Sequence, residues 1–439
     1  MAASRNGLPP LGLRANFSWT LAGNVLYAVC QWGMLAVLAK LTTTEMVGRF
    51  ALGDTICNPI MALFMLQLRG VQVTDAKREY SFGEYLGLGI ATTFVAIIVI
   101  IGIVFGSGYA VATALVVIII GFGKGVVAVS DIYFGLLQQR YRMDRIAKSM
   151  MLKGPLLVAA IAAGVLITGD VMWGVLAVFA ARLLMLFVYD IPSARTLMWD
   201  SVGNEGGDAA VRAALKPKWA LGKMKQLAWL SLPLGLVMML RQLHISVPRY
   251  AVERYMGESA LGIFAAIGYI RFAGSTVVNA LGQAASPVLA EYFATSQMRA
   301  YRRLMLKLLG LCLALGIGGL LLAVFIGPHI LRFVYKAEYA SHNNIFIWLM
   351  IAAGIQYMTS ALGYGMTACR RFKPQVVIQA AAAVIAIVAS LVLIPQYGLV
   401  GASWAVCIVY LIQIPLSAIV VLNALRQGGT PRNEAPEYD

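Results

Sequence analysis

Apolar runs of about 20 residues recur from one end of the chain to the other, separated by short polar segments. A run of this length crosses the hydrocarbon core of a bilayer as one α-helix. The first half predicts membrane-spanning helices at 17–40, 46–69, 85–105, 110–138, 151–168 and 171–190. A polar stretch over 191–226 follows, and six further helices are predicted at 228–248, 258–283, 304–327, 343–367, 375–394 and 399–424.

The polar stretch divides the predicted helices into two sets of six, an organisation typical of transporters. We therefore expect an N-terminal lobe over 1–190, a cytoplasmic linker over 191–226, and a C-terminal lobe with a short cytoplasmic tail over 227–439. A weak internal repeat agrees with two related halves. The segment from Val47 to Ala51 opens the second predicted helix, and the similar segment from Leu261 to Ala265 opens the eighth. Both enter from the same side, which predicts parallel repeats.

Composition supports a membrane protein, since 60% of the residues are hydrophobic and only 12% are charged. A soluble domain carries roughly 25% charged residues. The net charge of +16 would fit a nucleic-acid ligand, but most Lys and Arg residues occupy short loops on one side of the predicted membrane. This asymmetry places both termini in the cytoplasm by the positive-inside rule and argues against nucleic acid. The first apolar stretch lacks a cleavage site and is interpreted as a retained helix.

Five cysteines fall within or beside the apolar runs and lack any CxxC spacing, so neither a disulfide framework nor a zinc site is expected. No other metal ligand set and no cofactor motif is apparent. The chain also shows no paired carboxylates, no Ser/His/Asp set and no phosphate-binding loop. We therefore expect a protein that is not an enzyme and that needs neither metal nor cofactor.

Three segments resemble one family when their order and spacing are taken together: DIYFGLLQQRYRMDRIAKSMMLKGP, ILRFVYKAEYASHNNIFIWLMIAA and LVLIPQYGLVGASWAV. They look like the junctions between helices 4 and 5, 9 and 10, and 11 and 12 of the polysaccharide-type flippases in the multidrug/oligosaccharidyl-lipid/polysaccharide exporter superfamily. The resemblance covers essentially the whole chain. It implies an all-α integral membrane fold with twelve transmembrane helices in two six-helix lobes around a central cavity, and export of a lipid-linked sugar by alternating access. No motif identifies the sugar.

Charged side chains inside the predicted spans are functional candidates, because a charge near the bilayer centre costs at least about 2.5–3.5 kcal/mol on insertion scales. Arg271 lies near the middle of the helix over 258–283. Gly268, Ser275 and Asn279 share its face at helical spacing. Such polar faces line protein or water rather than lipid. The alternative is that Asn, Ser and Thr only hold helices together.

These faces predict one hydrophilic cavity with a cationic balance. The predicted substrate-binding residues are Arg271, Arg241, Lys124, Asn24, Tyr27, Gln31, Asn58, Ser275 and Asn279. The candidates for ion coupling are Asp54, Asp131 and His244. Arg182 is assigned a structural role, since the resemblance places its helix at the periphery.

A cationic pocket attracts anions, and Arg presents paired donors that match phosphate oxygens. The sequence therefore predicts a flippase for a polyprenyl-diphosphate-linked oligosaccharide of the undecaprenyl type, in the bacterial cytoplasmic membrane, with a polysaccharide polymerase as a further partner. The alternatives are a multidrug or organic-cation antiporter of the same superfamily, and a membrane polysaccharide polymerase or ligase. An antiporter requires acidic residues to dominate the cavity. A polymerase requires larger outer segments than the short loops predicted here.

Overall fold

The computed structural model describes residues 13–75, 78–199, 204–369 and 371–426, and all regular elements in these ranges are helical. The helices of the first half are α1 (Leu13–Leu41), α2 (Thr44–Phe64), α3 (Leu68–Thr74), α4 (Phe82–Gly106), α5 (Val111–Gln139), α6 (Met143–Thr168), α7 (Val171–Met185), the π-helix η1 (Leu186–Asp190), α8 (Ile191–Met198) and α9 (Asn204–Leu215). The rest are α10 (Leu221–Tyr269), α11 (Arg271–Ala294), α12 (Met298–Val334), α13 (Ala337–Ala340), α14 (Asn343–Ala368) and α15 (Phe372–Arg426).

The chain forms two compact units whose division falls inside α10. Unit 1 holds the chain up to Ser246 together with Gly257–Ile263, and unit 2 holds Val247–Met256 and the chain from Phe264 onward. The segment Gly257–Ile263 therefore belongs to unit 1, although the residues on both sides of it belong to unit 2. The lobes predicted on either side of 191–226 stay a prediction.

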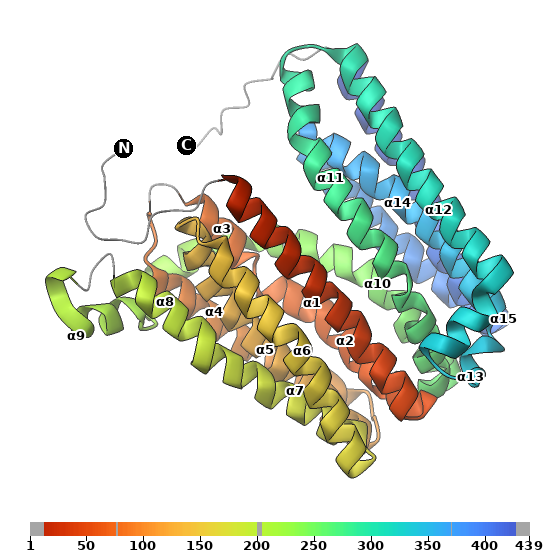
Figure 1. The fold of residues 1–439 in the computed structure, drawn as a ribbon, viewed down its shortest axis with the longest axis horizontal. Helices are drawn as coiled ribbons and strands as arrows, with labels where there is room; N and C mark the ends of the chain where they lie inside the picture. The colour runs from red at the N-terminus through yellow and green to blue at the C-terminus, as the bar shows by residue number, and fades with distance from the viewer. Residues whose placement is uncertain (1–12, 76–77, 200–203, 370, 427–439) are drawn as a thin grey trace. The chain divides into compact units, whose positions relative to one another are not determined.

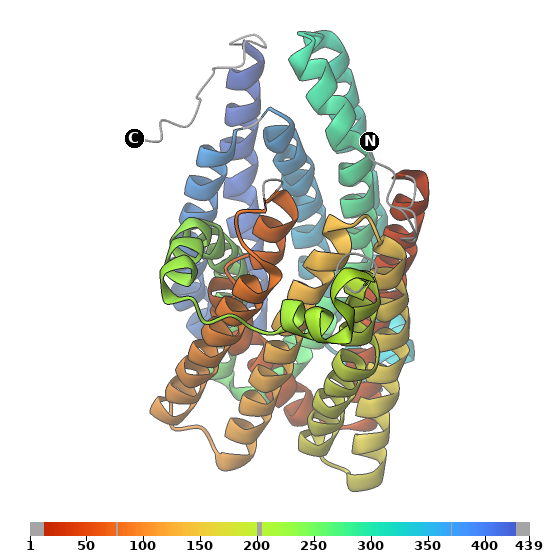
Figure 2. The ribbon, with the colours of Figure 1, turned by 90° about the vertical axis from the view of Figure 1, so that its left-hand side faces the viewer.

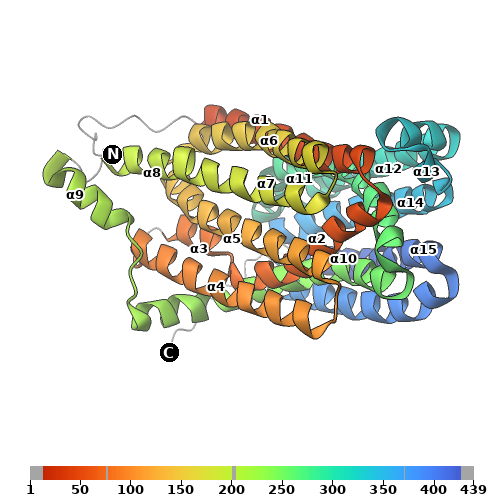
Figure 3. The ribbon, with the colours of Figure 1, turned by 90° about the horizontal axis from the view of Figure 1, so that it is seen from below.

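In unit 1, α6 lies between α1 and α7, and α5 packs against α2, α4 and α7 (Figures 1 and 3). The turn from α4 to α5 and the turn from α6 to α7 lie at the same end of the unit (Figure 2). Buried aromatic side chains from α4 and α5 form much of the core, among them Tyr85, Phe82, Tyr133 and Phe134. Helices that cross a membrane in succession run in alternating directions, so every second turn lies at the same end, as these two turns do.

In unit 2, α14 packs against α11, α12 and α15 (Figure 1). Tyr301 is fully buried in its core, and its hydroxyl donates a hydrogen bond to the carbonyl oxygen of Gly365 at 2.9 Å. Tyr335 makes the equivalent kind of contact with the carbonyl oxygen of Ala266 at 2.6 Å. Buried tyrosines therefore join the helices of this unit through backbone acceptors.

Ten helical segments of the described chain are long and apolar enough to cross a membrane, so the protein is a multi-pass membrane protein. Two of them, in α10 and α15, span 49 and 54 residues. A straight helix of 49 residues would be about 74 Å long, more than twice the thickness of the hydrocarbon core. Each is broken by a glycine at positive φ, Gly257 (φ 84°) and Gly398 (φ 58°). These breaks lie where the sequence predicts a turn between two spans. The count of twelve stays a prediction.

Several helices extend beyond their predicted ends on the basic side of the chain. The helix predicted from 151 begins at Met143, and the helix predicted from 304 begins at Met298. The added turns carry Arg145, Lys148, Arg299 and Arg302, and a search for apolar runs does not detect such basic residues as part of a helix. A helix can continue into the polar interface because long basic side chains reach toward water.

Candidate functional site

Three residues singled out from the sequence meet in unit 1. Lys124 Nζ on α5 lies 2.7 Å from Asp54 Oδ1 on α2, and it donates a hydrogen bond to Asn58 Oδ1, also at 2.7 Å. Asp54 and Asn58 are one turn apart on α2, so both face the same side chain on α5. Both partners of the ion pair are largely buried. The lysine and the carboxylate therefore neutralise each other, and the cluster contributes no net positive charge.

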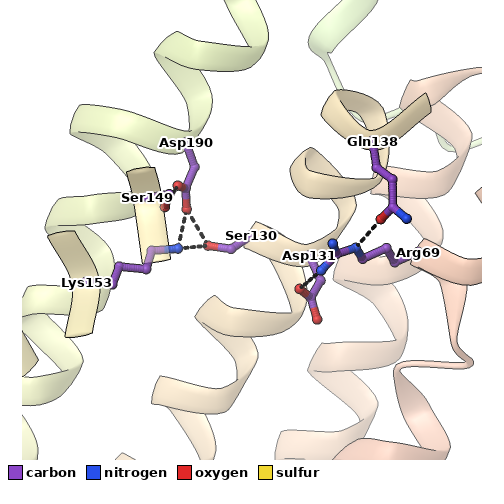
Figure 4. A network of polar contacts seen from close by, with 7 residues as sticks. All are labelled: Arg69, Ser130, Asp131, Gln138, Ser149, Lys153 and Asp190. Atoms are coloured by element: carbon purple, nitrogen blue, oxygen red, sulfur yellow. Dashed lines mark hydrogen bonds and ion pairs between the residues drawn. The ribbon is translucent and has the colours of Figure 1, made fainter. Parts of the chain in front are cut away.

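Asp131 does not pair with Lys124, which lies two turns earlier on the same helix. Its carboxylate lies 3.3 Å from Arg69 Nη1, and Arg69 Nε donates to Gln138 Oε1 at 3.1 Å (Figure 4). The chain enters this region through a break after α2, where Leu66 and Gln67 have positive φ. That break turns Arg69 toward α5, a change of direction that helical periodicity does not reveal.

A further ion pair, between Lys153 and Asp190, lies beside the Arg69–Asp131 pair (Figure 4). It was not predicted from the sequence. Asp190 is completely buried, and its Oδ2 lies 2.5 Å from Lys153 Nζ. Ser149 donates to Oδ1 at 2.6 Å and Ser130 donates to Oδ2 at 2.8 Å, so the carboxylate is fully satisfied (Figure 4). Asp190 is the last residue of the π-helix η1. A π-helical turn re-aims the side chains that follow it, and no pattern in the sequence marked this position.

The ring of Phe134 lies between the Arg69–Asp131 pair and the Lys153–Asp190 pair and contacts the cation of each. Lys153 Nζ lies 4.7 Å and the Arg69 guanidinium carbon lies 5.6 Å from its centroid. Cations over an aromatic face are attracted by the ring quadrupole. With two cations and two carboxylates, this network is neutral, and it fastens α3, α5, α6 and η1 together.

The polar face of α1 has two different parts. At one end, Asn16 Oδ1 accepts a hydrogen bond from the backbone nitrogen of Met143 at 3.1 Å, which holds α1 against the start of α6. Further along the helix, Tyr27 is hydrogen-bonded to Gln31, and Asn24 is exposed. The first part holds helices together, while the second leaves side chains open to a ligand.

Arg241 and His244, both on α10, belong to unit 1. Arg241 is exposed and forms no ion pair with a described residue, whereas His244 is buried. Asp54, Asp131 and His244 stay predictions as ion-coupling residues. In this structure Asp54 is paired with Lys124, and Asp131 is paired with Arg69.

In unit 2, the face of α11 that carries Arg271, Ser275 and Asn279 turns toward α14. Tyr357 donates to the carbonyl oxygen of Arg271 at 3.0 Å, and Tyr364 donates to Asn279 Oδ1 at 3.4 Å. Ser275 donates to the same Arg271 carbonyl oxygen at 3.1 Å. The two tyrosines were not predicted, although their spacing of seven residues places them on one face of α14.

The guanidinium group of Arg271 has no such partner. Its Nη1 is buried and makes no hydrogen bond to the described residues. Its backbone is held by Tyr357, so the position of the residue is fixed independently of its charge. The arrangement fits a cation that is kept for a ligand. The role of every residue in this set stays a prediction.

Comparisons with known proteins agree over nearly the full length of the chain. No protein-family model matches it. The chain is 23% identical over 395 residues to the capsular polysaccharide biosynthesis protein CapF of Staphylococcus aureus, which covers 90% of this chain and 95% of that protein. Among solved structures it resembles the lipid II flippase MurJ in an inward closed conformation, with a TM-score of 0.69 and 12% identity over 93% of this chain and 91% of that one. A mutant of the Vibrio cholerae MATE transporter VcmN gives a TM-score of 0.59 and 12% identity over 94% and 96% of the two chains.

These similarities confirm the all-α integral membrane fold, and they are to transporters and flippases rather than to enzymes. The chain has the fold of the lipid II flippase and of the MATE transporter, and it resembles the polysaccharide-type flippases of the multidrug/oligosaccharidyl-lipid/polysaccharide exporter superfamily, as the segments of its sequence indicated.

Proposed function

We propose that the protein moves a polyprenyl-diphosphate-linked oligosaccharide of the undecaprenyl type from the inner to the outer leaflet, by alternating access, for the synthesis of a surface polysaccharide such as O-antigen, capsule or exopolysaccharide. The similarity to a capsular polysaccharide biosynthesis protein and to a lipid II flippase supports this class of substrate. Its location would be the bacterial cytoplasmic membrane, with both termini in the cytoplasm. A polysaccharide polymerase would receive the product.

The observation that carries the proposal is the charge left over inside the membrane-spanning helices. Each of the three carboxylates described above is neutralised: Asp54 by Lys124, Asp131 by Arg69 and Asp190 by Lys153. Within the membrane spans predicted from the sequence, three arginines have neither an ion pair nor a side-chain hydrogen bond to a described residue: Arg182, Arg241 and Arg271. The available charge is therefore positive, which suits a diphosphate and repels an organic cation.

Reconstitution separates the two functions. The purified protein in vesicles, loaded with a fluorescent polyprenyl-diphosphate oligosaccharide in one leaflet, should expose that sugar to a glycosidase added on the other side. Vesicles without protein give the background, and a fluorescent organic cation with an imposed proton or sodium gradient is the parallel assay. Gradient-driven export of the cation, with no exposure of the lipid-linked sugar, would show that the antiporter alternative is correct.

A further inference from the structure

We propose that Arg182, together with Gly123 and Tyr27, forms a phosphate-binding subsite inside unit 1, and that the diphosphate of the lipid-linked substrate occupies it as it crosses the membrane. The identity of that ligand rests on the proposed function. The subsite itself rests on the surroundings of Arg182. The sequence had assigned this arginine to a structural role at the periphery.

Arg182 differs from three other cations on the helices of unit 1. Arg69, Lys124 and Lys153 each lie within ion-pair distance of a carboxylate on a neighbouring helix. Arg182 is partly buried, its Nε is fully shielded from solvent, and it forms no hydrogen bond or ion pair with a described residue. A structural arginine needs acceptors for its donors. A guanidinium with no acceptor among the described side chains is free to bind the oxygens of an anionic ligand.

The space around the guanidinium is set by a glycine on the facing helix. A Cβ on Gly123 of α5 would lie 2.8 Å from Arg182 Nη1 and 3.8 Å from its Cδ. Any side chain at position 123 would therefore press on the head group of the arginine. On α1, Tyr27 lies within the electrostatic reach of Arg182 and adds a hydroxyl to the same neighbourhood.

The contact between α5 and α7 does not depend on this charge. The rings of Phe122 on α5 and Phe179 on α7 pack with centroids 6.3 Å apart, one position before Gly123 and one turn before Arg182. Apolar packing therefore joins the two helices directly beside the subsite. A neutral side chain at 182 is expected to leave the fold in place.

The depth of the subsite distinguishes two sources of phosphate. Arg182 lies eleven residues into α7, about 17 Å along the helix from its first residue. Half of the hydrocarbon core measures about 15 Å. The head group of a resident phospholipid stays at the interface, whereas a diphosphate in transit passes the middle of the membrane. The position of Arg182 therefore fits the substrate and not a bound phospholipid.

The test measures binding and not transport alone. The purified full-length protein in detergent is titrated with a short-chain polyprenyl diphosphate, and its retained phosphatidylglycerol is measured separately by native mass spectrometry. Arg182→Met should weaken diphosphate binding roughly tenfold or more, the usual effect of losing a charge-assisted hydrogen bond. Arg182→Lys should lose less, because an ammonium keeps the charge without the paired donors. Arg332→Met, which removes an exposed arginine from α12, is the matched control and should bind like the wild type.

Gly123→Ala provides a second route, since it crowds the guanidinium without removing its charge. Weaker diphosphate binding in this variant and in Arg182→Lys supports the subsite even where Arg182→Met yields too little protein. Wild-type affinity in both variants would overturn it. Loss of phosphatidylglycerol instead of diphosphate binding would also overturn it, by assigning the arginine to a resident lipid. Failure of the wild-type protein to bind any polyprenyl diphosphate would contradict the proposed function itself, which is a different result.

Discussion

Gly48 on α2 packs directly against the backbone of Glu258, the residue that follows the break in α10. A Cβ on Gly48 would overlap the carbonyl oxygen of Glu258, and one on Gly262 would overlap the carbonyl oxygen of Thr44. Close to this contact, Arg49 Nε lies 2.9 Å from the Glu258 carboxylate. The two segments that the sequence presented as an internal repeat therefore lie against each other.

This contact predicts that Gly48→Ala destabilises the protein. The added methyl group meets backbone atoms that cannot rotate away, and such overpacking typically costs about 1–3 kcal/mol. Thermal unfolding in detergent measures the effect as a lower Tm. Gly33→Ala is the matched control, because a Cβ there would meet nothing within 4 Å. Equal Tm values for the two variants would show that the close approach of α2 and α10 is not needed for stability.

The Lys124–Asp54 pair predicts different outcomes for a single and a double substitution. Asp54→Asn leaves the lysine without its counter-charge, and we expect a lower yield of folded protein. Adding Lys124→Met removes the orphaned charge and should restore the yield. If Asp54 also couples transport to an ion, the double variant regains stability but its transport no longer depends on a gradient. Transport that keeps its gradient dependence in this variant would exclude Asp54 as the coupling residue.

The buried Lys153–Asp190 pair predicts a larger effect. Asp190→Ala leaves a buried ammonium next to two serine hydroxyls, and breaking a buried pair in this way costs about 3–5 kcal/mol. The combined variant Lys153→Met with Asp190→Leu should recover much of that loss, since no unpaired charge stays behind. A double-mutant cycle on the unfolding temperature gives the coupling. Additive losses would show that the two side chains act independently.

The spacing of apolar residues was enough to predict most helices, because one helix crosses one bilayer and the length of its apolar run reports that crossing. The turns at Gly257 and Gly398 were also predicted, since glycine and proline interrupt the apolar runs there. Pairing between helices was not predictable in the same way. Lys124 met Asp54 and not Asp131 because the choice depends on which faces of α2 and α5 pack together, a property of the tertiary structure.

The surroundings of Arg182 and Asp190 also could not be predicted from hydrophobic periodicity. The structural role assigned to Arg182 from the sequence stays a prediction, and the sequence did not indicate that its guanidinium lies against Gly123 of the neighbouring helix. Asp190 looked like the ordinary end of a helix, yet the π-helical turn before it buries its carboxylate completely. Neither the direction of a single side chain nor a π-helical turn follows from hydrophobic periodicity.

The asymmetry of basic residues predicts the orientation in the membrane. Gln297 is exposed just before α12, and Ser341 is exposed just after α13, which follows the other end of α12. We expect Ser341 to lie outside and Gln297 to lie in the cytoplasm. The native cysteines are first replaced, and single cysteines at these positions are then treated with a membrane-impermeant maleimide on whole cells. We expect Ser341→Cys to react and Gln297→Cys to react only after lysis. Reaction of both from outside would refute the topology. Ser201, the other position suited to this labelling, lies outside the described residues.

Arg271 gives the prediction that bears most directly on mechanism. Its backbone carbonyl oxygen accepts hydrogen bonds from Tyr357 and Ser275, while its Nη1 is buried without a hydrogen-bond partner among the described residues. A Cβ on Gly268, one turn earlier, would meet nothing within 4 Å, so space is left on the same face. A neutral residue would be easier to place in the membrane than an unpaired arginine. We therefore expect Arg271→Ala to abolish export of the polysaccharide without loss of protein, and Arg271→Lys to restore it only in part.

Arg271→Ala and Arg271→Lys are each expressed in a strain that lacks the native gene. Surface polysaccharide and protein level are then measured in the same cells. Tyr357→Phe is the companion variant, because it removes a hydrogen bond to the Arg271 backbone and leaves the guanidinium in place. Its export should fall far less than that of Arg271→Ala, since the charge is the part that binds phosphate. If Arg271 were a packing residue instead, the Ala variant would lose protein level or thermal stability along with export. Normal polysaccharide from Arg271→Ala at a normal protein level would refute a cationic site for the diphosphate at this position.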